Sequence, residues 1–139
     1  MDTPEKITFQ RDYPGEPGQA SHVRADLARI STGFPAAEDL ILMASELAAN
    51  AITHSRSGQP GGRFTVRANL YPGDHASVEV IDQGGPWTPP KPGDEHGRGL
   101  AIVDAIAGDG NWGIDDGTAC RVAWFRLNWH QDQSQGQAS

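Results

Sequence analysis

Alternation of apolar and polar side chains predicts several short strands in this chain. Apolar residues alternate with polar ones in residues 7–13, 64–70 and 78–82. A two-residue period of this kind is typical of strands that bury one face. Residues 112–114 and 121–127 are predicted to form a closing pair of strands.

Apolar residues at intervals of three and four predict three amphipathic helices. In the first, which ends near Gly33, Asp26 falls between the apolar positions and is expected on the polar face. The second helix runs from about residue 35 to residue 55. The third is predicted to begin at Leu100, after a loop rich in proline and glycine.

The order of these elements is strand, helix, helix, strand, strand, loop, helix, strand, strand. It predicts an α+β fold: a two-layer α/β sandwich, with a mostly antiparallel sheet and its helices on one face. A chain of 139 residues suits one domain, which we place at residues 5–130. The polar residues 131–139 are expected to be a disordered tail.

Composition narrows the functional classes. The formal net charge of −7 argues against binding to a phosphate backbone, which usually leaves a basic surface, so we expect no direct nucleic-acid partner. No apolar run approaches the roughly 20 residues that cross a bilayer, and no secretion signal opens the chain, so we expect a cytoplasmic protein. The single cysteine, Cys120, excludes an internal disulfide and is expected to pack within a strand.

One face of the predicted second helix carries residues suited to a metal-bound phosphate. Glu46, Asn50 and Thr53 lie at intervals of four and three, which places their side chains in one stripe. No Lys or Arg occurs in residues 35–55, although exposed helical faces usually mix both signs of charge. The amide oxygen of Asn50 is a hard ligand for Mg²⁺, and the carboxylate of Glu46 can accept a proton. The alternative is a solvated helix face.

The third predicted strand ends in a carboxylate on its core face. Asp82 shares the face of Val78 and Val80, and two glycines, Gly84 and Gly85, follow it. A buried carboxylate needs a donor, which the 6-amino group of adenine could supply, while the glycines let a flat ring approach the backbone. Alternatively, Asp82 caps the turn after the strand.

Residues 97–99, Gly-Arg-Gly, immediately precede the predicted third helix, where free N–H groups can meet phosphate oxygens. They are not a Walker A loop, and Ile102 stands where a dinucleotide fingerprint needs its third glycine. By itself, a glycine before a helix usually marks only a turn. The side chain of Arg98 either contacts a phosphate or pairs with Asp94 or Glu95.

Taken together, the Glu46 to Asn50 helix, Asp82-x-Gly84 and Gly97-x-Gly99-Leu100 resemble the ATPase superfamily of gyrase B and the histidine kinases. The chain is most similar to the bacterial anti-sigma factor serine/threonine kinases, particularly the small stand-alone actinobacterial type. The resemblance extends over residues 9–127. It implies the histidine-kinase-like ATPase fold (Bergerat fold), with two layers and a mixed sheet.

The resemblance also implies roles for the site residues, with ATP and Mg²⁺ as cofactors. Glu46 would act as the general base and Asn50 would coordinate the Mg²⁺ that bridges the phosphates. Asp82 would bind adenine in a pocket shaped by Gly84. The phosphates would be bound at residues 97–100, through the backbone of Gly97, Gly99 and Leu100. For the side chain of Arg98, a phosphate contact and an ion pair with Asp94 or Glu95 both stay open.

The function implied is that of an ATP-binding anti-sigma regulatory factor, a protein kinase that phosphorylates Ser or Thr of an anti-anti-sigma partner. A sigma factor would be the second partner, and the family allows a homodimer. The alternative is a nucleotide-dependent binding module without kinase activity. Adjacent glycines at 84 and 85 and a short loop with four prolines bear on this choice, because they depart from the family pattern. A detached catalytic half of a histidine kinase is disfavoured, because no helical hairpin precedes the first strand.

Overall fold

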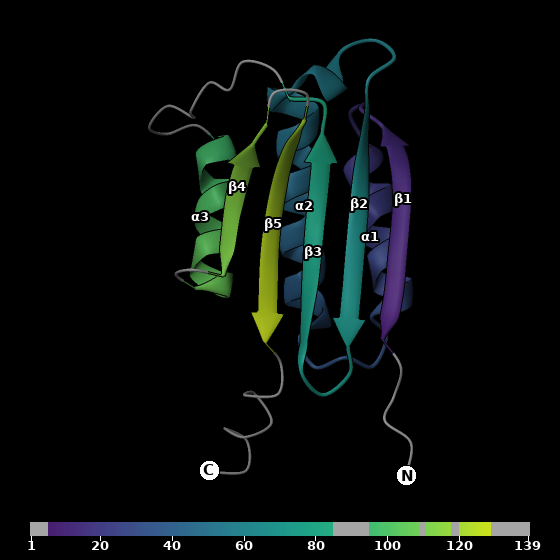
Figure 1. The fold of residues 1–139 in the computed structure, drawn as a ribbon, viewed down its shortest axis with the longest axis vertical. Helices are drawn as coiled ribbons and strands as arrows, with labels where there is room; N and C mark the ends of the chain where they lie inside the picture. Colours follow the sequence, from purple (N-terminus) through teal and green to yellow (C-terminus); the bar gives the residue numbers. More distant parts are fainter. Residues whose placement is uncertain (1–5, 85–94, 109–110, 118–119, 129–139) are drawn as a thin grey trace.

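The computed structural model describes residues 6–84, 95–108, 111–117 and 120–128, with the backbone alone at 95–100 (Figure 1). The predicted tail at 131–139 lies outside these residues. The described elements are β1 (Ile7–Pro14), α1 (Gln19–Ile30), α2 (Ala37–His54), the short 3-10 helix η1 (Arg56–Gly58), β2 (Arg63–Tyr71), β3 (His75–Asp82), α3 (Glu95–Ala107), β4 (Trp112–Asp116) and β5 (Arg121–Asn128).

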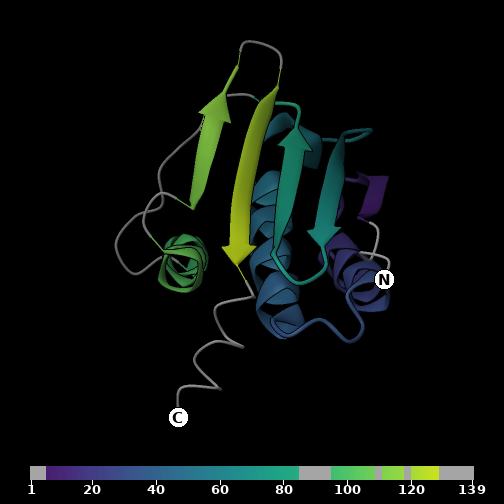
Figure 2. The same cartoon turned by 60° about the horizontal axis from the view of Figure 1, so that its bottom comes forward.

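The described strands form one sheet in the order β1-β2-β3-β5-β4, with the helices on one face (Figures 1 and 2). The predicted two-layer α+β fold is confirmed. Each strand pairing is antiparallel, whereas the family resemblance implied a mixed sheet. The connections explain this difference. The paired helices α1 and α2 return the chain to the end where β1 stopped, and β5 lies between β3 and β4, which run in the same direction.

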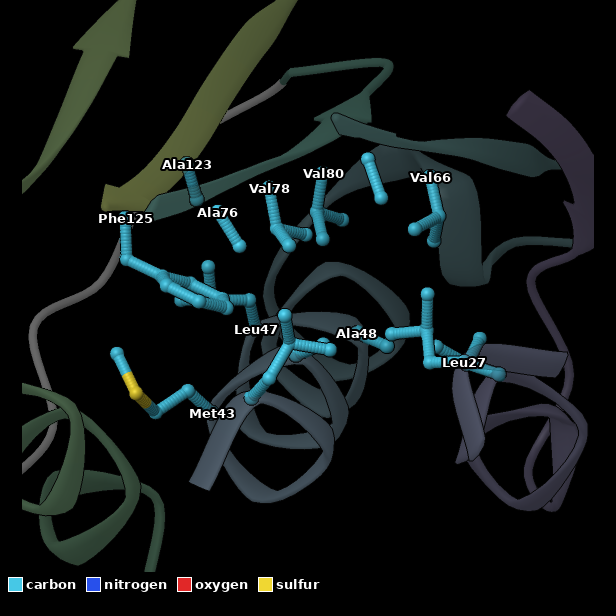
Figure 3. Close-up of a cluster of buried hydrophobic side chains, with 14 of the residues drawn as sticks. Leu27, Met43, Leu47, Ala48, Val66, Ala76, Val78, Val80, Ala123 and Phe125 are labelled. Atoms are coloured by element: carbon cyan, nitrogen blue, oxygen red, sulfur yellow. The ribbon is translucent and has the colours of Figure 1, made fainter. Parts of the chain in front are cut away.

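A single apolar layer between the sheet and the helices α1 and α2 forms the core (Figure 3). β2 and β3 alternate strictly between buried and partly buried residues, as their sequences predict. Leu27 of α1 and Leu47 of α2 point at the sheet, where Val66, Val78 and Phe125 are fully buried. Burial of each such side chain contributes about 1.5–3 kcal/mol, so the helices and the sheet depend on each other for stability.

Helix α3 packs against α2, β4 and β5, and its Val103 side chain is fully buried in the core. The helix begins at Glu95, five residues before the predicted start at Leu100. Each glycine costs a helix about 1 kcal/mol relative to alanine, which is why Gly97 and Gly99 predicted a loop. In the described part of the chain, no helix has the length and apolar character of a membrane span.

Asp26 was predicted on the polar face of α1 but is only 6% exposed. Its carboxylate accepts hydrogen bonds from the Tyr13 hydroxyl at 2.6 Å, Arg11 at 2.7 Å and Arg29 at 3.0 Å. Burial acts to raise the pKa of Asp26, but the hydrogen bonds from Tyr13, Arg29 and Arg11 outweigh it and lower the pKa. Burial and the bond to Asp26 raise the pKa of Tyr13. This cluster joins α1 to the edge strand β1.

Replacing Asp26 by Asn should lower the free energy of unfolding by about 2 kcal/mol at pH 7, because hydrogen bonds to a charged acceptor are lost. The pKa of Asp26 is lower in the folded than in the unfolded state, so its contribution is present above pH 4 and fades as the pH falls through the folded value. Urea unfolding of wild type and Asp26→Asn at pH 7 and pH 3 measures this. An equal difference at both pH values would contradict the assignment.

Candidate functional site

The elements that carry the predicted site residues meet at one end of the sheet. Strand β3 and helix α2 run toward the upper end in Figure 1, whereas α3 and β5 start there. The last turns of α2, the end of β3 and the first turn of α3 therefore lie at the same end of the molecule. Asn50 therefore lies near the end of α2, Asp82 and Gly84 at the end of β3, and residues 97–100 at the start of α3, all toward this end of the molecule.

The three residues of the stripe predicted on α2 differ in how far they are buried. Glu46 is partly buried, Asn50 is buried at 7% exposure and Thr53 is exposed. A fully solvated helix face is therefore excluded for Asn50. Buried amides are nearly always hydrogen-bonded, yet among the described residues none forms a hydrogen bond with the Asn50 side chain. A buried amide that has no hydrogen-bond partner among the described residues fits a site for a metal or nucleotide ligand, because its oxygen is a hard ligand.

Asp82 faces the core as predicted, with 5% exposure. Its Oδ1 atom accepts a hydrogen bond of 2.7 Å from the backbone N–H of Gly84, so the turn-capping alternative is also present. Gly84 has φ +70°, in the left-handed region that favours glycine. Capping and ligand binding are compatible, because a carboxylate has about four acceptor positions.

Arg121 is the site residue that sequence reasoning missed. It stands directly opposite Asp82 in the pairing of β3 with β5, and its Nε donates to Asp82 Oδ2 at 3.2 Å. Arg121 is only 2% exposed. A signal for its burial was present, because Arg121 has the same strand parity as Ala123 and Phe125, but its partner depends on a register that the sequence leaves open.

The turn after Asp82 is also held from the side of β2. The buried Ser57 in η1 accepts a hydrogen bond of 2.9 Å from the Gln83 backbone N–H. The Gln83 side chain in turn accepts one of 2.8 Å from the Arg63 backbone N–H. Together with Arg121 on β5, these bonds fix both sides of the strand end, so the Asp82 carboxylate has a defined position.

The residues predicted to bind phosphate lie inside α3 and not before it. In a helix that begins at Glu95, the first N–H group that bonds within the helix is that of the fourth residue, Arg98. The N–H of Gly97 is therefore available to an anion, while those of Arg98, Gly99 and Leu100 fall in the hydrogen-bonded part of the helix. The side chain of Arg98 lies outside the described part, so both of its alternatives stay predictions.

Cys120 is exposed and lies just before β5, so the expectation that it packs within a strand was wrong. Its backbone instead lies beside Gly84, where an added Cβ would be 3.7 Å from the Cα of Cys120. This contact places the turn after β3 against the start of β5.

Comparison with known proteins agrees with this arrangement. The family model of the histidine kinase-like ATPase domain matches residues 13–124, which include every site residue named above. The chain belongs to the histidine kinase-like ATPase family. The chain is 25% identical over 120 residues to serine-protein kinase RsbW of Oceanobacillus iheyensis, across 73% of this chain and 75% of that protein. It is 37% identical over 76 residues to the uncharacterized protein SCO4941 of Streptomyces coelicolor, across 51% and 68%.

The described residues of this histidine kinase-like ATPase fit a magnesium nucleotide. Asn50 offers a buried amide oxygen, and Mg²⁺ in nucleotide sites usually combines a few protein ligands with phosphate oxygens and water. Asp82 offers a buried acceptor for a base, and the start of α3 offers N–H groups for phosphate. A nucleotide held by these groups would lie along the upper end of the sheet in Figure 1.

Replacing Gly84 by Ala should cost about 1–2 kcal/mol of stability, because an L side chain is strained at this backbone conformation. Gly73, with φ +78° in the turn between β2 and β3, is a matched control at the opposite end of the sheet. Urea unfolding should give similar losses for Gly84→Ala and Gly73→Ala. Only Gly84→Ala should weaken ATP binding, because strain at this position displaces the backbone N–H that holds Asp82. Equal loss of affinity in both variants would contradict this site.

Proposed function

We propose that this chain is an ATP-binding anti-sigma regulatory factor that acts as a serine/threonine protein kinase on an anti-anti-sigma partner. The observation that supports it most is the buried Asn50 amide, one helical turn after Glu46, within a histidine kinase-like ATPase domain. The likeness to a protein named serine-protein kinase RsbW favours protein phosphorylation within this family.

In this proposal, Asn50 would hold the Mg²⁺ that accompanies ATP. Magnesium would supply charge neutralisation on the phosphoryl group. Burial of Asn50 at 7% exposure supports the role, because an amide fixed on a helix loses little freedom on binding. The phosphates would be bound at the start of α3, where the backbone N–H of Gly97 has no partner within the helix, with the Arg98 side chain as an added cation. Phosphate binding by Gly99 and Leu100 stays a prediction, because their N–H groups lie further into the helix.

Glu46 is the proposed general base. It accepts the proton of the partner's Ser or Thr hydroxyl as that oxygen attacks the γ-phosphorus. The new oxygen–phosphorus bond replaces the bond to the β-phosphate oxygen, and ADP leaves. Glu46 is partly buried on α2, so it is sheltered by the helix and still reachable by a substrate.

Asp82 and Gly84 form the proposed adenine pocket. Asp82 accepts a hydrogen bond from the 6-amino group, and Gly84 keeps side-chain atoms away from the ring. The hydrogen bonds of Asp82 to Gly84 and Arg121 support this role, because they fix the carboxylate before the base arrives. A sigma factor is the proposed second protein partner, and homodimer formation stays a prediction.

The Glu46→Gln variant should keep ATP affinity and lose about 10²- to 10⁴-fold in phosphoryl transfer, because only the base is removed. Transfer is measured with radiolabelled ATP and each anti-anti-sigma protein encoded in the same genome. Glu38→Gln, an exposed carboxylate in the first turn of the same helix, is the matched control and should be unaffected.

Unchanged transfer in Glu46→Gln would remove Glu46 from the mechanism. ATP binding with no labelled protein would instead favour the alternative, a binding module whose nucleotide sets its affinity for a sigma factor or another regulator.

A further inference from the structure

The pair formed by Asp82 and Arg121 is more buried than its capping role requires. Both side chains are at most 5% exposed, and the two residues are directly opposite across β3 and β5. A buried ion pair adds little net stability, because desolvation of both charges offsets their attraction. The Asp82 turn could be capped through Gly84 alone, so the arginine calls for another explanation.

Asp82 accepts hydrogen bonds from a backbone donor and from a guanidinium donor. Gly84 N–H donates to Oδ1 at 2.7 Å and Arg121 Nε donates to Oδ2 at 3.2 Å. Both bonds favour the carboxylate over the neutral acid. A carboxylate can only accept hydrogen bonds, whereas a carboxylic acid can also donate one. The charge state of Asp82 therefore decides which purine edge can bind beside it.

We propose that Arg121 is a positioning residue that sets base selectivity: it holds Asp82 as a pure acceptor, so the site takes 6-amino purines and rejects 6-oxo purines. This inference rests on the proposed nucleotide site and adds to it the residue that controls the choice between 6-amino and 6-oxo purines. A 6-amino group donates to the carboxylate, whereas the 6-oxo group of inosine or guanine presents a second acceptor to it. Two acceptors without a shared proton repel each other.

Among the described residues, the groups that could affect the charge of Asp82 lie on the two neighbouring strands and on the helix that packs on β3. On β2, the register places the apolar Phe64 beside it, and on β5 Arg121 is its cation. Helix α2, which packs on β3, carries Glu46 and ends at His54. In the proposed site Glu46 acts at the phosphate end of the nucleotide, so its charge affects ATP and ITP alike and cancels in the ratio of their affinities.

The test is the ratio of dissociation constants for ITP and ATP, each with Mg²⁺, between pH 8 and pH 5.5. ITP differs from ATP in carrying a 6-oxo group and lacking the amino group. Wild type should prefer ATP by about 10- to 100-fold, the effect of a hydrogen bond to a charged group, and the ratio should not change with pH.

In Arg121→Gln, a donor remains but the positive charge is lost, so the buried carboxyl favours its protonated form. As the pH falls, the acid can donate to the 6-oxo group, and the ratio should fall toward one. Arg121→Lys keeps the cation and should restore the wild-type ratio. Arg126→Gln removes an exposed arginine from the same strand and is the matched control, with no expected change. Circular dichroism checks each fold, and Arg121→Met is the second variant if the Gln form does not fold.

The outcomes separate this inference from the proposed function. If wild type binds no Mg²⁺-ATP, both fail. If wild type binds ATP but does not discriminate against ITP, or if Arg121→Gln and Arg121→Met keep the wild-type ratio at every pH, the role of Arg121 fails and the nucleotide site stands. A ratio that falls with pH only in the variants without a cation supports the proposal.

Discussion

The ion pair between Asp82 and Arg121 joins the sheet to the site, and its geometry depends on the whole fold. It requires β5 to lie beside β3 with these two residues in register, which in turn requires β5 to be inserted between β3 and β4. It also requires both side chains to face the helices, because only that face offers a buried position. A change of one residue in the register would turn Arg121 to the opposite face of the sheet and leave Asp82 buried without its cation.

Helix α2 serves the core and the site at the same time. Leu47 and Ala48 fill the layer beneath the sheet, while Glu46 and Asn50 lie beside them on the same turns. Apolar packing thus fixes the rotation of the helix, and the rotation fixes where the two polar side chains lie. Burial of the Asn50 amide removes its hydrogen bonds to water, and a bound ligand would replace these interactions. The site therefore depends on the same packing that stabilises the domain.

Local patterns predicted most of the elements, whereas the polar contacts between elements could not be predicted from them. Alternation located β2 and β3 correctly because their buried faces are apolar up to Asp82, the last residue of β3. Gly97 and Gly99 delayed the predicted start of α3, since their low helix propensity is outweighed by tertiary packing. Asp26 and Arg121 were not recognised as buried, because each is compensated by partners far away in sequence. Such pairings depend on the strand register and on the position of α1, which a single sequence does not specify.

The central claim is that this end of the fold binds ATP through magnesium held by Asn50. Calorimetric titration with ATP, with and without Mg²⁺, tests it most directly in wild type and Asn50→Ala, with the exposed Thr53→Ala on the same stripe as control. We expect magnesium-dependent binding in wild type and Thr53→Ala, weakened at least about tenfold in Asn50→Ala. Absence of binding to wild type, or full magnesium dependence in Asn50→Ala, would contradict it.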